Sequence, residues 1–308
     1  MHIVTPYGAC VALSALAAIL TLAFLRKREM GRVDPPGRAP VLTLALSCIP
    51  AAFVGARLLY CLFRFDFYFV EMGALSALQT WNGGFLLYGA LIGASLAAAC
   101  ASRANGVSVA DTLDELAVPG LLSVFICRLA EGFTFEGVGT WVESEALMRL
   151  PIAVQNDWGE WQLAVFLWEA AAAALILLAV HPRRGKGHSG ERFMTALVLY
   201  ACCQVVFESL RMDSCLRIGF VRVSQVLSGT AVFAVAIVRA LRRGDRRRAV
   251  SCALAILACI GAAGGLEWAL DKTAVPNAAL YAAMIAVCAL MAAIARLAGK
   301  TARRGGAR

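Results

Sequence analysis

The most constraining feature of this sequence is a series of long apolar stretches that carry almost no charge. A helix that crosses a lipid bilayer needs about 20 mainly apolar residues, and nine stretches approach this length. They are Gly8–Leu25, Val41–Phe63, Phe85–Ala101, Leu116–Ala130, Trp161–Val180, Phe193–Leu210, Val221–Val238, Ala249–Leu266 and Ala278–Leu297. The fourth is the shortest, which is typical of a tilted or partly re-entrant segment. The sequence therefore predicts an all-α, polytopic membrane helix bundle with about nine transmembrane helices.

The composition agrees with a membrane protein. Apolar residues make up 60% of the 308 residues and charged residues only 16%, whereas soluble proteins average about 45 to 50% apolar and about 25% charged. These values disfavour a soluble domain, a nucleic-acid binder and a disordered chain. The first stretch lacks a positive flank before it and an Ala-x-Ala site after it, so we expect a retained helix and not a removable signal peptide.

The basic residues predict the orientation of the chain. The first, third, fifth and seventh connections between the apolar stretches and the C-terminal tail together hold 21 of the 29 lysines and arginines. Cytoplasmic loops carry such an excess, so we expect the N terminus outside and the C terminus in the cytoplasm. The opposite, outer side carries the acidic stretch Glu131–Glu160.

Polar residues gather at the outer ends of five expected helices. These residues are Arg57, Tyr88, Arg128, Arg211, Arg222 and Gln225. An arginine at the bilayer centre costs about 2.5 to 3.5 kcal/mol on insertion scales, so an arginine within a membrane helix usually has a function. Guanidinium groups bind phosphate bidentately and stay charged when partly desolvated. The set therefore favours a site for an anion, such as a phospholipid headgroup, at the outer leaflet.

Each of these residues alone also has a simpler interpretation. A single arginine near a helix end can extend to the headgroups without doing chemistry. Tyr88 alone is typical of an interfacial aromatic residue, and Gly83 and Gly84 could serve helix packing. Glu169, nearer the middle of its stretch, is harder to explain in this way, because a carboxylate there needs a partner or a wet cavity.

The cysteines and histidines predict neither a disulfide framework nor a metal site. Most of the 11 cysteines fall inside apolar stretches, where cysteine behaves as a small apolar residue, and there is no C-x-x-C pair. Cys215 is the one cysteine clearly in an outer loop. His181 and His188 lie in an inner basic loop without neighbouring ligands, so we expect no metal there.

Six short motifs follow one another along the first 240 residues. They are Gly55-Ala-Arg57-Leu-Leu-Tyr60, Gly83-Gly84-Phe-Leu-Leu-Tyr88-Gly89, Arg128-x-x-Glu131-x-x-x-x-Glu136, Leu167-Trp168-Glu169, Phe207-Glu208-Ser-Leu-Arg211 and Val223-Ser224-Gln225. In this order they resemble the bacterial prolipoprotein diacylglyceryl transferase family. The resemblance implies a seven-helix core over residues 1–240, with the N terminus outside. It leaves 241–308 as a C-terminal two-helix extension with a basic tail, which we expect to support packing or assembly.

The resemblance also implies an activity. Enzymes of that family transfer the diacylglyceryl group of phosphatidylglycerol to the lipobox cysteine thiol of a secreted lipoprotein precursor and release glycerol phosphate. The expected partners are phosphatidylglycerol, the prolipoprotein lipobox peptide and membrane lipids, without nucleic acid or cofactor. The expected location is the bacterial cytoplasmic membrane, with the site at its outer face. The resemblance implies that Arg128 and Arg211 bind the lipid phosphate and that Glu136 corresponds to a family glutamate.

The chain departs from the family pattern at three places. Tyr88-Gly89-Ala90 replaces His-Gly-Gly, Glu131 stands where the family has asparagine, and Glu169 keeps only the end of a His-Pro-x-x-Leu-Tyr-Glu motif. A cysteine thiol attacks as the thiolate, so an enzyme must remove its proton or stabilise the anion. Glu131 and, as a weaker base, Tyr88 are the candidate proton-transfer groups.

The sequence contains two sets of candidate residues and leaves two alternative functions open. The expected catalytic residues are Arg128, Arg211, Glu131 and Tyr88; the expected substrate-binding residues are Arg57, Gly83, Gly84, Glu136, Glu169, Glu208 and Gln225. One alternative is a homologue that holds phospholipid or lipoprotein without transferring anything. The other is an organic-anion transporter, which is disfavoured because transporter sites usually lie at the midplane.

Overall fold

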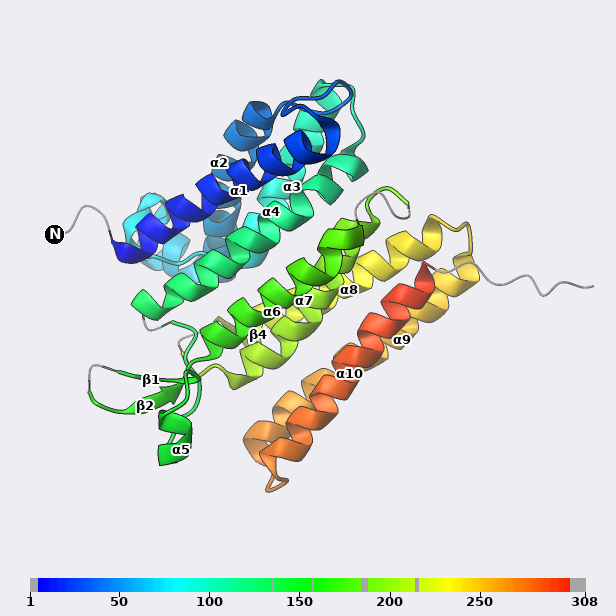
Figure 1. Ribbon diagram of the computed structural model, residues 1–308. Coiled ribbons are helices and arrows are strands. Elements are labelled where there is room, and N and C mark those ends of the chain that lie inside the picture. Colours follow the sequence, from blue (N-terminus) through cyan, green and yellow to red (C-terminus); the bar gives the residue numbers. More distant parts are fainter. Residues whose placement is uncertain (1–4, 135, 157, 184–187, 214–215, 300–308) are drawn as a thin grey trace, which may run out of the picture. The chain divides into compact units, whose positions relative to one another are not determined.

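A computed structural model of the chain describes residues 5–134, 136–156, 158–183, 188–213 and 216–299 (Figure 1). Cys215, parts of the basic cluster at 183–192 and most of the basic tail lie outside the described residues. The chain divides into two compact units, Met1–Thr134 with Ala173–Phe193 and Phe135–Ala172 with Met194–Arg308. Each unit is described by itself below.

Eight of the described helices are long and apolar enough to cross a membrane. They are α1 (Pro6–Met30), α2 (Val41–Phe63), α3 (Leu87–Ala104), α4 (Val109–Ala130), α7 (Glu191–Leu210), α8 (Val223–Leu241), α9 (Arg246–Lys272) and α10 (Asn277–Ala298). A further apolar helix, α6 (Val165–Val180), has 16 residues. These helices confirm the predicted all-α, polytopic membrane fold class.

Two of the predicted stretches differ in length from the helices that form. The fourth is a full helix and not a short one, because α4 begins at Val109, where the Ser108 hydroxyl accepts a hydrogen bond from the Asp111 amide (3.3 Å). The fifth is shorter than expected. Its first residues, Trp161–Leu163, form strand β2 and pair antiparallel with β1 (Ala153–Gln155), so α6 starts only at Val165.

The first unit is built on close contacts between α2 and α3 and between α1 and α4. α2 and α3 approach through glycine: a Cβ added to Gly89 would overlap the carbonyl oxygen of Gly55, and one added to Gly93 would overlap that of Ala51. Such small-residue contacts let helix backbones meet in a membrane. Between α2 and α3 the chain makes a π turn, η1 (Asp66–Glu71), and two 3₁₀ turns, η2 (Ala74–Leu78) and η3 (Thr80–Asn82).

A buried ion pair fixes the beginning of α4 to the end of α1. Arg26 is fully buried, and its Nη2 lies 2.6 Å from Glu115 Oε2. Arg38 lies 3.4 Å from the other oxygen of Glu115. Both oxygens of the buried Glu115 carboxylate are thus paired, as a buried charge requires.

The second unit has an apolar core shared by α7, α8, α9 and α10. Its buried side chains include Val198, Val232, Ile256 and Met284. The chain before α6 holds a short helix, α5 (Glu145–Met148), and the β1–β2 hairpin. A second hairpin, β3 (Arg217–Ile218) with β4 (Val221–Arg222), leads into α8. Two more 3₁₀ turns belong to the first unit: η4 (Glu131–Phe133) follows α4, and η5 (His181–Arg183) follows α6.

Candidate functional site

Arg211 is the centre of a buried polar cluster in the second unit. It follows the last residue of α7 and is 8% exposed. Its Nε lies 3.2 Å from both carboxylate oxygens of Asp213, and its Nη2 lies 2.5 Å from Asp213 Oδ2. Its Nη1 lies 3.5 Å from Oε2 of Glu169, a fully buried residue of α6. The guanidinium group is therefore held in a fixed plane by two carboxylates.

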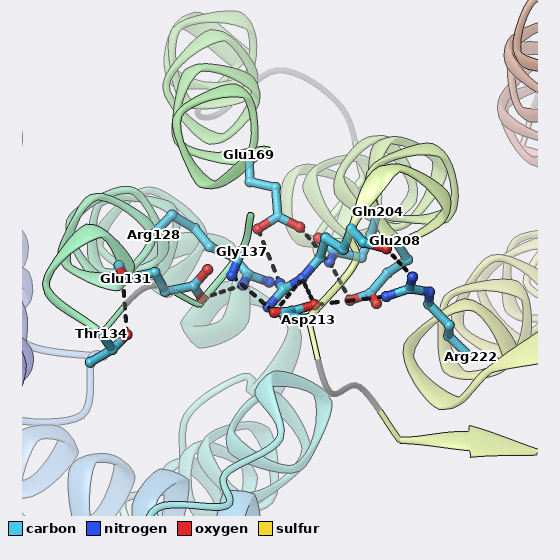
Figure 2. Close-up of polar contacts among 10 residues, drawn as sticks. Arg128, Glu131, Thr134, Gly137, Glu169, Gln204, Glu208, Asp213 and Arg222 are labelled. Carbon is cyan, nitrogen blue, oxygen red and sulfur yellow. Dashed lines mark hydrogen bonds and ion pairs between the residues drawn. The ribbon is translucent and has the colours of Figure 1, made fainter. Parts of the chain in front are cut away.

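Asp213 connects Arg211 to two further elements. Its Oδ2 accepts a hydrogen bond from the backbone N–H of Gly137 (2.9 Å), and its Oδ1 lies 3.8 Å from Nη1 of Arg222. Arg222, at the end of β4, also donates through Nη2 to the backbone carbonyl of Arg211. One aspartate thus joins the end of α7, the segment before α5 and the start of α8, as Figure 2 shows.

Gln204 completes this cluster from within α7. Its Nε2 donates to Glu169 (2.8 Å) and to Glu208 (2.9 Å), which lies one turn further along the same helix. Gln204 is 1% exposed and Glu208 3% exposed, so both are buried. We refer to Glu169, Gln204, Glu208, Arg211, Asp213 and Arg222 as the Arg211 cluster (Figure 2). It combines two arginines with three carboxylates.

The first unit holds a smaller pair of the same kind. Arg128 lies in the last turn of α4, where the negative end of the helix dipole stabilises a cation. It forms an ion pair with Glu131, three residues further on, and both side chains are buried. The turn is closed by Thr134, whose N–H and hydroxyl each donate to the carbonyl of Glu131 at 2.9 Å (Figure 2). We call Arg128 and Glu131 the Arg128 pair.

Arg57 binds the polypeptide backbone of its own unit. It is 5% exposed, and Nε, Nη1 and Nη2 are all directed at the segment between α2 and α3. The accepting carbonyls belong to Ser76, Ala77, Gln79, Gly83 and Gly84, and the hydroxyl of Tyr68 also accepts. These contacts favour a role in ordering the segment between α2 and α3.

The glycines predicted beside Arg57 serve the same segment. Gly84 has a φ of 79°, and a Cβ added there would lie 2.6 Å from the Tyr60 ring and 2.8 Å from Nη1 of Arg57. Tyr88 lies in the first turn of α3 and is 5% exposed. The backbone before it is fixed by a hydrogen bond from the Leu86 N–H to the carbonyl of Ala56 (3.1 Å).

The structure thus gathers some of the predicted residues into groups. Glu169, Glu208 and Arg211 lie in one cluster, Arg128 lies with Glu131, and the glycines lie with Arg57. Gln225 lies in the first turn of α8, where its Nε2 donates to Ser209, Val205 and Glu267 and its Oε1 accepts the backbone N–H of Arg222. Glu136 is exposed.

Sequence analysis missed Asp213, Gln204 and Gly137. Asp213 and Gln204 each have a sequence feature that could have indicated them. Asp213 is the only acid close in sequence after Arg211, and Gln204 precedes Glu208 by four residues, which places both on one face of a helix. Gly137 contributes only its backbone N–H, which any residue other than proline would also offer, so the sequence does not indicate this contact.

The chemistry of these groups suits an anion with several oxygen atoms. A guanidinium group binds carboxylate and phosphate with the same bidentate geometry. Arg211 already holds a carboxylate in that way. In the structure Asp213 occupies the bidentate position at Arg211 that a phosphate group would take.

Comparison with known proteins gives consistent matches. Residues 2–241 match the family model described as prolipoprotein diacylglyceryl transferase. A protein of Listeria welshimeri named phosphatidylglycerol–prolipoprotein diacylglyceryl transferase is 31% identical over 229 residues, which cover 72% of this chain and 79% of the relative. A protein of the same name from Streptococcus suis is 30% identical over 243 residues, covering 77% and 87%. A third, from Pediococcus pentosaceus, is 29% identical over 230 residues, covering 72% and 80%.

Proposed function

Because the chain belongs to the prolipoprotein diacylglyceryl transferase family, we propose that it transfers the diacylglyceryl group of phosphatidylglycerol to the lipobox cysteine of a prolipoprotein. We place the reaction at the outer face of the bacterial cytoplasmic membrane. The observation that carries the proposal is the Arg211 cluster, a buried arginine held by two carboxylates at the end of a membrane helix. This cluster lies within the part of the chain that matches the family.

The reaction is a substitution at carbon. The cysteine sulfur forms a thioether bond to the terminal glycerol carbon of the diacylglyceryl group, and the bond from that carbon to the phosphate oxygen breaks. The electron pair of that bond leaves with the oxygen as glycerol phosphate, and the thiol proton passes to a base. An enzyme must therefore stabilise negative charge on the departing phosphate and accept a proton.

Arg211 meets the first of these demands. Its guanidinium plane is fixed before the substrate arrives, so little reorganisation is needed when charge develops on the phosphate. Glu169 and Asp213 supply that orientation from two directions. Arg128 offers the same chemistry within its own unit, where Glu131 orients it, and we propose it as a phosphate ligand in its own right.

Glu131 meets the second demand best. It is a carboxylate placed beside an arginine in the last turn of a membrane helix and the turn that follows. A carboxylate is an ordinary general base, whereas the neutral phenol of Tyr88 is a weak one. We therefore propose Glu131, which lies with Arg128 in the first unit, as the acceptor of the thiol proton, and Tyr88 as the weaker candidate for this role.

A direct transfer assay tests the proposal. The purified protein is incubated with phosphatidylglycerol and a lipobox peptide, and the mass of the peptide is measured. We expect the mass to rise by one diacylglyceryl group, and glycerol phosphate to appear in equal amount. A peptide with serine in place of cysteine should stay unmodified.

The same assay separates the enzyme from a homologue that only holds lipid. Folded protein that binds phosphatidylglycerol but never modifies the peptide would exclude the transferase. Modification that continues when phosphatidylglycerol is replaced by a zwitterionic phospholipid would exclude the proposed lipid donor.

A further inference from the structure

The helices α9 and α10 lie beyond the part of the chain that matches the family, which ends at residue 241. The yellow-to-red part of Figure 1 contains these helices and α8, against which they pack. They share the apolar core of the second unit. The core contacts come from small and medium apolar residues such as Ile256, Cys259, Met284 and Cys288. Packing alone explains these residues.

Packing does not explain Glu267. This carboxylate lies in the last turns of α9 and is 9% exposed. A carboxylate within a membrane helix is costly unless it is paired or hydrogen-bonded. Glu267 Oε2 accepts hydrogen bonds from Nε2 of Gln225 (2.9 Å) and from the hydroxyl of Ser209. The extension thus contributes a buried acceptor to residues of α7 and α8.

Both partners of Glu267 lie next to the Arg211 cluster. Ser209 precedes Arg211 by two residues in the last turn of α7. The other side of the Gln225 amide, Oε1, accepts the backbone N–H of Arg222 (3.0 Å) and so caps α8. Arg222 in turn donates to the carbonyl of Arg211. Two short connections therefore lead from Glu267 to Arg211.

Partners on both sides fix the orientation of the Gln225 amide: Nε2 donates to the carbonyl of Val205 (3.2 Å) as well as to Glu267, and Oε1 accepts the N–H of Arg222. A carboxylate only accepts hydrogen bonds, so it must face the NH₂ group of Gln225 and not its oxygen. The amide oxygen is then left for the Arg222 N–H. Tyr281 of α10 also binds the end of α7, because its hydroxyl donates a hydrogen bond to the carbonyl of Ser209 (3.3 Å).

We propose that Glu267 is a positioning residue: through Gln225 and Ser209, the appended helices fix the end of α7 and the start of α8, and thereby orient Arg211 and Arg222 for the anion. The inference rests on the proposed function for the identity of that anion, the phosphate of phosphatidylglycerol. It differs from the expectation that the extension serves packing or assembly alone, which stays a prediction that the following experiment tests.

The test compares two conversions of a carboxylate to an amide on the same helix. Glu267→Gln keeps the shape of the side chain but replaces the carboxylate acceptor with a neutral amide, which weakens the hydrogen bonds from Gln225 and Ser209. Asp271→Asn is the matched control, because Asp271 is exposed and one turn away. Phosphatidylglycerol binding and peptide modification are measured for the full chain in bilayers. We expect Glu267→Gln to weaken binding about 10-fold, the effect of one charge-assisted hydrogen bond, and Asp271→Asn to match the wild type.

A double-mutant cycle distinguishes positioning from general stability. If Glu267 acts by orienting Arg211, then Glu267→Gln should have little further effect in an Arg211→Lys background, because the oriented guanidinium fork is already gone. Additive losses in the two variants would overturn the inference. So would wild-type lipid binding in Glu267→Gln. Ser209→Ala removes the second connection with little change in volume, and should weaken binding in the same non-additive way if Glu267→Gln fails to fold.

The two proposals fail in different ways. Wild-type protein that binds phosphatidylglycerol without modifying the peptide would overturn the proposed function, while the binding comparison still decides the role of Glu267. Normal transfer with no difference between Glu267→Gln and Asp271→Asn would overturn the role of Glu267 alone.

Discussion

Single arginines carry most of the functional argument, and the structure gives them different surroundings. Arg211 faces carboxylates, Arg128 faces one carboxylate, and Arg57 faces backbone carbonyls. Under the proposed function, an arginine whose plane is held by carboxylates would pair with the lipid phosphate. An arginine directed at carbonyls instead stabilises the loop that provides them. The three residues should therefore respond differently to substitution by lysine.

Arg211→Lys should impair lipid binding and transfer. Lysine keeps the charge but loses the planar fork, and the loss of one charge-assisted contact of about 1.5 to 3 kcal/mol corresponds to a roughly 10- to 150-fold loss of affinity. Arg128→Lys should behave in the same direction. Arg242→Lys, at an exposed position after α8, is the control. Near wild-type binding and turnover in both outer variants, in folded protein, would contradict the phosphate role.

Arg57→Lys should change stability more than chemistry. The guanidinium group of Arg57 donates to five backbone carbonyls. The ammonium group of lysine has only three N–H donors and cannot replace all of these contacts. We expect the protein to lose about 1 to 3 kcal/mol of stability and residues 64–86 to be cleaved faster by protease. Thermal unfolding and limited proteolysis in detergent measure the two effects. An unchanged cleavage rate together with lost lipid binding would instead make Arg57 a lipid ligand.

At the scale of elements, helix contacts decide where the polar residues lie. The α2–α3 contact depends on glycine because the two backbones touch at Gly55, Gly89 and Gly93. This contact places Arg57 of α2 and Tyr88 of α3 in one unit.

Gly89→Ala tests that contact. The added Cβ would overlap the Gly55 carbonyl, so α2 and α3 must separate, and we expect a destabilisation of about 1 to 3 kcal/mol. Gly120→Ala in α4 is the matched control, because nothing lies within 4 Å of a Cβ added there; it should stabilise the helix by up to about 1 kcal/mol. The difference in melting temperature between the variants gives the answer. Equal melting temperatures would show that α2 and α3 adjust freely.

The sequence predicts the helices well because apolar length is a local property. It predicts their ends less well, because these depend on distant partners. α4 extends over Asp111 and Asp114 since Arg38 pairs with the former and the N–H groups of Gly190 and Phe193 bind the latter. α6 loses its first turn to a strand pairing that the apolar run conceals.

The residues of the candidate site are likewise only partly predictable from the sequence. Arg211 and Glu169 stand out in the sequence because charge is rare within apolar stretches, and the structure places them 3.5 Å apart. Gln225 stands out equally, but its amide faces Ser209 and Glu267, which only the fold brings near. Arg26 resembles an ordinary loop residue in the sequence, yet it is fully buried against Glu115.

At the scale of the whole molecule, the distribution of basic residues predicts the topology. The chain carries a net charge of +9, and 21 of its 29 lysines and arginines lie on one expected side. The outer face would then hold the ends of α4 and α7, where Arg128 and Arg211 lie. The proposed access to a lipid and to a secreted peptide depends on this orientation.

Labelling of single cysteines tests the orientation. In a background without native cysteines, Glu143→Cys should react with a membrane-impermeant maleimide added to intact cells, and Arg246→Cys should react only after the membrane is opened. A cysteine in place of Arg242 provides a second inner position. Reaction of both Glu143→Cys and Arg246→Cys from the same side would contradict the topology and with it the outer position of the site.

The short helix α6 has a consequence for the surrounding lipid. Its 16 residues span about 24 Å at about 1.5 Å each, less than the roughly 30 Å of a hydrocarbon core. Trp168, Leu175 and Leu178 of this helix are exposed, so acyl chains should reach it. A bilayer that adapts to so short a span becomes thinner there. Headgroups of the outer leaflet would then lie deeper beside Glu169 than elsewhere around the protein, and acyl-chain length in a reconstituted membrane should influence how readily a phospholipid phosphate reaches Arg211.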